Sequence, residues 1–189
     1  MKIALAGIVG IIIAGILWFV SAGNRLVTLN EEVNSSWAQV ENVYQRRADL
    51  IPNLVNTVKG YAKHESDTLI AVTQARASVG QVKVNSSNDL KKFEAAQGEL
   101  SSALSRLMVV VEKYPDLKAN QGFLDLQSQL EGTENRITVE RQRFNEKARE
   151  FNTSIKVVPG SFVAASKGYT ARPYFESKKG SENAPEVKF

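Results

Sequence analysis

An unbroken apolar run from Ile3 to Val20 is the feature that most constrains this chain of 189 residues. Wound as an α-helix that rises about 1.5 Å per residue, the run extends roughly 27 Å, close to the thickness of the hydrocarbon core of a bilayer. No comparable run recurs in the rest of the sequence. We therefore expect one transmembrane anchor within residues 1–22.

The same run also resembles a cleaved secretory signal, because Lys2 is basic and Ser21 and Ala22 are small residues in the region where a signal peptidase cuts. The apolar core of such a signal is usually about 7 to 15 residues long, so this longer run favours a retained anchor. Orientation is weakly encoded, since Lys2 and Arg25 nearly cancel across the span. The next cation is Arg46, and we therefore expect the body on the non-cytoplasmic side.

Small residues recur every four positions within the span, at Ala6, Gly10 and Ala14. This spacing places them on one helix face, where they allow close approach of a second helix in lipid. Alanine and glycine are also common in membrane spans, so the stripe has an ordinary explanation as well. The pattern makes these three residues our candidates for helix packing within the membrane.

Composition excludes several classes of chemistry. The roughly 165 residues after the anchor suffice for one domain with a substantial core. Cysteine is absent and His64 is the single histidine, which excludes disulfides, a thiolate nucleophile and thiolate-bound zinc. His64-Glu65 begins a zinc-protease motif, but Thr68 stands where the second histidine is needed. We expect no catalytic site, no metal and no cofactor, and hence no enzyme.

From Asn24 onward the apolar residues recur at helical spacing, which predicts an all-α body. A first helix is expected over residues 23–47, and Asp49 with Pro52 indicates a break and the start of a second helix that ends at Gly80. A loop over 80–88 should precede a third helix, which runs from Asp89 to Tyr114. The last and longest helix is expected from Asp116 to Val158.

Four long helices with short connections pack most simply as an elongated up-and-down antiparallel four-helix bundle. We therefore expect three regions: an anchor in 1–22, a bundle in 23–158, and an irregular C-terminal segment with a mobile tail in 159–189. Aromatic residues among Gly and Pro suggest that this last segment lies over apolar surface.

Polar residues beside the apolar stripes are the candidates for a functional site, because buried charge is costly unless it is paired. They are Arg46, Arg47, Asp49, Glu134, Asn135, Arg136, Arg141, Arg143 and Asn145. Such groups could form a hydrogen-bonded network that sets helix register, or their arginines could bind an anionic ligand. A third reading is an internally paired or solvated helix surface.

The C-terminal part of the chain is basic, since residues 136–179 hold 10 Lys/Arg against 4 Asp/Glu. Glu146 and Glu150 lie at pairing distances from basic neighbours along the helix, so much of this charge can be neutralised locally. No nucleic-acid-binding module is recognisable. We expect no nucleic acid among the partners.

Several motifs in order along the chain resemble the LemA family. They are Trp37-Ala-Gln-Val-Glu41, Arg46-Arg-Ala-Asp-Leu-Ile-Pro-Asn-Leu54, Val58-Lys-Gly-Tyr-Ala-Lys-His-Glu65, Ala75-Arg-Ala77, Val111-Glu-Lys-Tyr-Pro-Asp-Leu-Lys-Ala-Asn120, Glu131-Gly-Thr-Glu-Asn-Arg-Ile137, Arg141-Gln-Arg-Phe-Asn145, Pro173-Tyr-Phe175 and Ala184-Pro-Glu-Val-Lys-Phe189. The resemblance implies a bacterial protein with one N-terminal membrane helix and a long antiparallel bundle, without an established enzymatic activity or cofactor. Gly23 departs from the family, which usually carries an aromatic residue there.

These observations lead to two functional hypotheses. The first is a non-enzymatic protein of the bacterial inner membrane, crossing it once, which forms homo-oligomers or scaffolds another membrane protein. The alternative is a regulatory or ligand-binding module, in which arginines of the last helix bind an anionic headgroup or peptide. Both make the lipid bilayer a partner.

Overall fold

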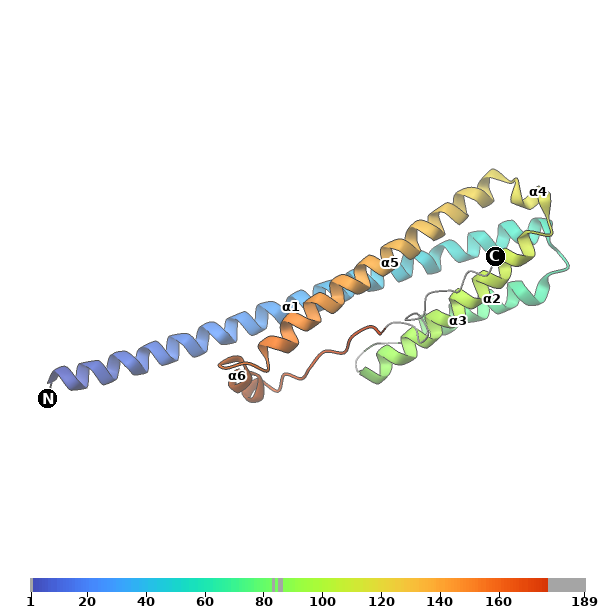
Figure 1. The fold of residues 1–189 in the computed structure, drawn as a ribbon. Helices are drawn as coiled ribbons and strands as arrows, with labels where there is room; N and C mark the ends of the chain where they lie inside the picture. The colour runs from blue at the N-terminus through green and yellow to red at the C-terminus, as the bar shows by residue number, and fades with distance from the viewer. Residues whose placement is uncertain (1, 83, 85–86, 177–189) are drawn as a thin grey trace, which may run out of the picture.

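The computed structural model describes residues 2–82, 84 and 87–176, and every regular element in these residues is an α-helix (Figure 1). The four long helices are α1 (Lys2–Tyr61), α2 (Ser66–Gly80), α3 (Ser87–Val111) and α5 (Gln121–Ser154). Two short helices, α4 (Pro115–Lys118) and α6 (Gly160–Lys167), precede and follow α5. The long helices alternate in direction along an elongated body, which confirms the expected all-α antiparallel bundle.

Helix α1 extends well beyond the other helices at its N-terminal end (Figure 1). The side chains from Leu5 to Val20 are exposed, with the large apolar ones between 45% and 74% accessible. This is one helix that is long and apolar enough to cross a membrane, with a mean hydropathy of 2.4 over its most apolar window. The same helix then continues without interruption into the bundle.

The core lies where α1 and α5 pack along each other, with the α2–α3 hairpin beside them. The stripes expected from the sequence are buried in both long helices, including Leu26, Val33, Val40, Phe123, Ile137 and Phe151. Trp37 of α1 joins the layers, since its ring lies 5.8 Å from that of Phe93 in α3 and 5.5 Å from that of Phe144 in α5. Aromatic pairs at this distance add to the stabilisation that burial supplies.

The break expected at Asp49–Pro52 is wrong, because α1 runs through Pro52 to Tyr61. Proline has no N–H to donate to the carbonyl four residues earlier, which here belongs to Ala48. The Arg76 side chain of α2 supplies the missing donor, and its Nε lies 2.8 Å from the Ala48 oxygen. The chain turns instead at residues 62–65, so the second helix begins at Ser66.

Two expectations near the C-terminus also change. The predicted helix from Asp116 divides into α4 and α5, and Asn120 caps α5 by accepting a hydrogen bond from the Phe123 N–H at 3.0 Å. Helix α5 ends at Ser154 rather than Val158. Residues 160–167, which were expected to be irregular, form α6 and pack on α1.

Glycines fix the two ends of α6. A Cβ at Gly160 would overlap the carbonyl oxygen of Ser154, so a side chain cannot fit at this position. Gly168 ends the helix in the left-handed conformation with φ of 70°, which glycine adopts without strain. Residues 168–176, here called the strap, then run without regular secondary structure back along α5 (Figure 1). The tail expected to be mobile, over residues 177–189, lies outside the described residues.

Candidate functional site

Arg47 occupies a core position on α1, three residues after the buried Tyr44 and four before the buried Ile51. Its side chain is 3% exposed. One Nη1 atom donates to Glu134 Oε2 of α5 at 2.7 Å and to Ser101 Oγ of α3 at 3.3 Å, while Nη2 donates to Gln97 Oε1 of α3. One guanidinium group therefore connects three helices.

Two buried donors of this network have no hydrogen-bond partner among the described residues. They are Arg47 Nε and Gln97 Nε2. Unpaired buried donors are costly, so both groups are suited to bind an acceptor oxygen. Both unpaired atoms are N–H donors, so a group bound by them would have to offer hydrogen-bond acceptors.

Arg141 of α5 forms a second ion pair on the same side of the bundle. Its Nη2 lies 2.7 Å from Glu94 Oε1 of α3 and 3.1 Å from the carbonyl oxygen of Glu176. The guanidinium also stacks over the Phe175 ring, 4.5 Å from its centre. Burial raises the pKa of Glu94, and the attraction of Arg141 offsets only part of this effect.

A cavity of about 550 Å³ lies between the two arginine pairs and is lined by α1, α3, α5 and Glu176. Two cations, Arg47 and Arg141, face it together with the three acidic residues Glu94, Glu134 and Glu176. Burial also raises the pKa of Tyr44 in its wall, so this phenol stays protonated well above neutral pH. The excess of carboxylates makes the cavity a poor site for a phosphate or carboxylate ligand.

Asn145 does not join the arginine pairs but holds the strap. Its Nδ2 donates to the Phe175 carbonyl, and the Phe175 N–H donates to its Oδ1, both at 2.9 Å. Asn152, two turns later on α5, brackets the backbone of Arg172 in the same way, at 2.8 and 2.7 Å. Arg172 then reaches α1, where its Nη2 donates to Asn30 and Asn34.

The structure thus brings Arg47, Glu134 and Arg141 to one cavity and leaves the other candidates apart from it. Arg46, Asn135 and Arg136 are exposed and make no side-chain hydrogen bond or ion pair within the described part of the chain. Asp49 accepts a hydrogen bond from Gln45, and Arg143 pairs with Glu140 on its own helix. Glu134 and Arg141, although seven residues apart, bind different partners.

The sequence did not lead us to the α3 residues that bind Arg47 and Arg141. Gln97 interrupts the apolar stripe of α3 between Phe93 and Leu100, and it is 5% exposed. A polar residue in an apolar stripe is the signal that could have identified it. Asn152 gave the same signal beside the buried Phe151.

Among the described residues, no group of three or more His, Asp or Glu side chains gathers where it could hold a metal. The stripe of Ala6, Gly10 and Ala14 is exposed on the part of α1 that extends beyond the bundle, and apart from its chain neighbours and the surrounding helix backbone nothing lies within 4 Å of a Cβ built on Gly10. Its packing role stays a prediction.

The sequence is similar to those of several known proteins. The chain is 25% identical over 181 residues to magnetosome protein MamQ of Magnetospirillum gryphiswaldense, covering 84% of this chain and 66% of MamQ. It is also 25% identical over 147 residues to protein LemA of Metamycoplasma hominis, covering 77% of this chain and 65% of the relative. The chain therefore spans about two thirds of the length of these curated relatives.

The sequence motifs, the elongated helical bundle and a match to a family model agree with one another. That model describes the LemA family and covers residues 36–189 of the chain. The chain belongs to the LemA family.

Proposed function

We propose that this chain is a non-enzymatic, membrane-anchored helical scaffold that assembles with copies of itself or holds another membrane protein. The observation that carries the proposal is the continuity of α1, a single helix from Lys2 to Tyr61. An exposed apolar span and the longest helix of the bundle are parts of one element. If the apolar segments of two chains associate in the membrane, the continuous helix also fixes the positions of their helical bodies, because no hinge separates the two parts.

The span offers a better assembly surface than the bundle does. Outside residues 157–162, the large apolar side chains that are exposed on the bundle stand singly, as do Ile70 on α2, Val109 on α3 and Val139 on α5. Isolated apolar residues of this kind are normal on a soluble surface. The stripe of Ala6, Gly10 and Ala14 supports helix association within the bilayer.

The alternative of an anionic ligand has weaker support. Arg141 is engaged by Glu94 and Phe175, and Arg143 by Glu140. Exchanging Arg141 and Arg143 for Gln tests this alternative, since an anion-binding site would lose affinity for liposomes that contain phosphatidylglycerol. Unchanged binding to these liposomes would contradict an anionic headgroup as the ligand of these arginines.

Light scattering of the full-length chain in detergent tests self-assembly. We expect a mass above that of the monomer at micromolar concentration, and a Gly10→Leu variant whose association is about tenfold weaker because the helices can no longer approach closely. Gly15→Leu is the matched control, since Gly15 lies off the stripe and is equally open. A monomer at all concentrations, for the full chain and for a chain that begins at Asn24, contradicts self-assembly.

We also propose that the body lies on the non-cytoplasmic side of the bacterial inner membrane. The chain contains no cysteine, so Val109→Cys places one thiol on an exposed site of α3. A membrane-impermeant maleimide should label this thiol in intact spheroplasts as fully as in lysed ones. Labelling that requires lysis places the body in the cytoplasm.

A further inference from the structure

The bundle end at which α1 continues into its exposed apolar N-terminal part carries three exposed apolar side chains and several exposed cations. Its apolar members are Val157, Val158 and Phe162, which are 52%, 62% and 65% exposed. They come from the turn that follows α5 and from α6 itself. Three large apolar side chains on one short stretch differ from the isolated ones elsewhere on the bundle.

The position of this surface relative to the span follows from how α6 packs. Val163 and Ala164 are buried, and a Cβ built on Gly23 of α1 would lie 3.8 Å from Val163 Cγ1. Gly23 stands three residues after the last residue of the apolar run, which is roughly 4.5 Å along a helix. If α1 crosses the bilayer as proposed above, α6 lies at the level of the lipid headgroups.

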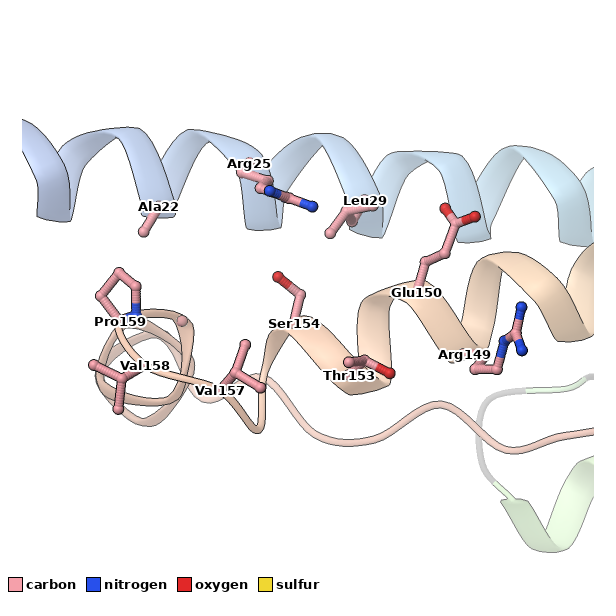
Figure 2. A pocket seen from close by; sticks show the side chains of 11 residues that line it. Ala22, Arg25, Leu29, Arg149, Glu150, Thr153, Ser154, Val157, Val158 and Pro159 are labelled. Carbon is pink, nitrogen blue, oxygen red and sulfur yellow. The ribbon is translucent and has the colours of Figure 1, made fainter.

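The direction of α6 is the one expected of a helix in the headgroup region of a bilayer. Figure 2 shows the segment after Pro159 end-on, while α1 and α5 run across the view. Helix α6 is therefore set crosswise to α1, and a helix crosswise to a membrane span lies along the membrane surface. Helices in this position bury an apolar face at the boundary between headgroups and acyl chains.

Charge at this end complements an anionic bilayer. Arg25, Arg149, Lys156 and Lys167 are exposed and make no ion pair within the described residues. Arg25 and Arg149 also face a cavity of about 530 Å³ between α1 and the end of α5 (Figure 2). Glu150, which shares this cavity, pairs with Lys147, 3.2 Å away. Basic residues near a membrane surface attract anionic lipids.

We propose that residues 156–167 form a second membrane contact, in which Val157, Val158 and Phe162 enter the interface of an anionic bilayer and the neighbouring cations bind lipid phosphates. This contact rests on the proposed membrane anchoring, and it adds a role for α6 that anchoring alone does not require. Together with the span, it would hold the bundle at a fixed tilt on the membrane.

Single cysteines in the full-length chain allow a direct test, because the natural sequence has none. An environment-sensitive fluorophore is attached at Phe162→Cys or Val158→Cys, and the protein is placed in nanodiscs of phosphatidylcholine with phosphatidylglycerol. Lipids with a doxyl quencher near the headgroup should quench these labels about threefold more than a label at Val109→Cys, on the far end of α3. A label at Ile12→Cys reports the span by its response to a deep quencher.

The outcomes separate this contact from the anchoring. A label at Ile12 quenched from within the bilayer, with labels at 158 and 162 as unquenched as at 109, overturns the contact and leaves the anchor standing. Labels at all four positions unquenched by lipid overturn both. Labels at 158 and 162 protected from aqueous iodide but not reached by the lipid quencher show a protein cover, and this also overturns a lipid contact.

Lipid charge provides the second arm. Quenching at 162 should be stronger with phosphatidylglycerol than in phosphatidylcholine alone, and the variant with both Lys156→Gln and Lys167→Gln should lose this difference. Lys118→Gln, at the opposite end of the bundle, is the matched control and should retain it. A difference that survives in the double variant contradicts the role of these cations.

Discussion

At the scale of one residue, the buried guanidinium of Arg47 joins three helices through hydrogen bonds to Ser101, Glu134 and Gln97. Its partner Glu134 is 56% exposed, so loss of the arginine leaves that carboxylate in water rather than stranded in the core. We expect Arg47→Ala to lower the free energy of unfolding by about 2 to 3 kcal/mol through lost packing and hydrogen bonds. Arg47→Met, which keeps the volume, should cost about 1 kcal/mol or less.

Urea denaturation followed by circular dichroism measures both variants. The neighbouring Arg46 is exposed, and Arg46→Ala should change the free energy of unfolding by less than about 0.5 kcal/mol. Equal losses for Arg47→Ala and Arg47→Met would show that the charge, and not the filled space, carries the stabilisation.

The raised pKa of Glu94 predicts how the free energy of unfolding depends on pH. Burial raises the pKa of its carboxyl above the ordinary value of 4.5, even beside Arg141. The folded state therefore holds this proton more tightly than the unfolded state, and the stabilisation is present below the unfolded pKa and lost as pH rises through the folded one. Glu94→Gln removes this dependence, so the variant should gain stability relative to the natural chain as pH rises above 4.5.

Unfolding free energies measured in steps from pH 4 to pH 7 follow this difference. Glu99→Gln on the same helix is the control, since Glu99 is exposed and its variant should track the natural chain across the range. If the stability of Glu94→Gln relative to the natural chain instead falls as pH rises, the attraction of Arg141, rather than burial, has the larger effect on the pKa of Glu94.

At the scale of elements, Pro52 and Arg76 form a pair that preserves α1. Arg76 Nε occupies the Ala48 carbonyl that Pro52 cannot bind. Arg76→Ala should destabilise the natural chain by about 1 to 2 kcal/mol, because it leaves that carbonyl unpaired. In a Pro52→Ala background the helix supplies its own donor, and Arg76→Ala should cost about 1 kcal/mol less.

A double-mutant cycle from urea denaturation measures this coupling. Arg106→Ala, at an exposed arginine of α3, should show no coupling to Pro52→Ala. Independent effects of Pro52→Ala and Arg76→Ala would mean that the hydrogen bond does not compensate for the proline.

The same pair explains what sequence could and could not predict. Apolar spacing identified the buried stripes of α1, α3 and α5, because the period of the apolar residues along one segment marks the face that its helix turns to the core. The helix break at Pro52 was predicted wrongly, since the compensating donor comes from a different helix. The partners of Arg47 and Arg141 depend on the rotation of α3 against α1 and α5, which no spacing along one segment encodes.

At the scale of the whole molecule, α1 joins the exposed apolar N-terminal segment to the bundle as one continuous helix. The ion pairs of Arg47 with Glu134 and of Lys147 with Glu32 show that α1 and α5 run antiparallel in a fixed register. Val139 on α5 therefore lies beside residues near Val40 of α1, about 40 Å along the helix from Ile13. Spin labels at Ile13→Cys and Val139→Cys should give one narrow distance distribution near that value in nanodiscs.

A flexible Gly-Ser-Gly insertion after Ser21 should broaden this distribution, because it replaces a continuous helix with a linker. Labels at Ile70→Cys and Val139→Cys, both within the bundle, are the matched control and should be unaffected by the insertion.

Gly23 has the lowest helix propensity of the residues that connect the apolar run of α1 to the bundle, yet it is buried against Val163. Gly23→Ala, which fits this contact, should leave the distribution as narrow as before, whereas a broad distribution in the natural chain would mean that α1 bends between membrane and bundle.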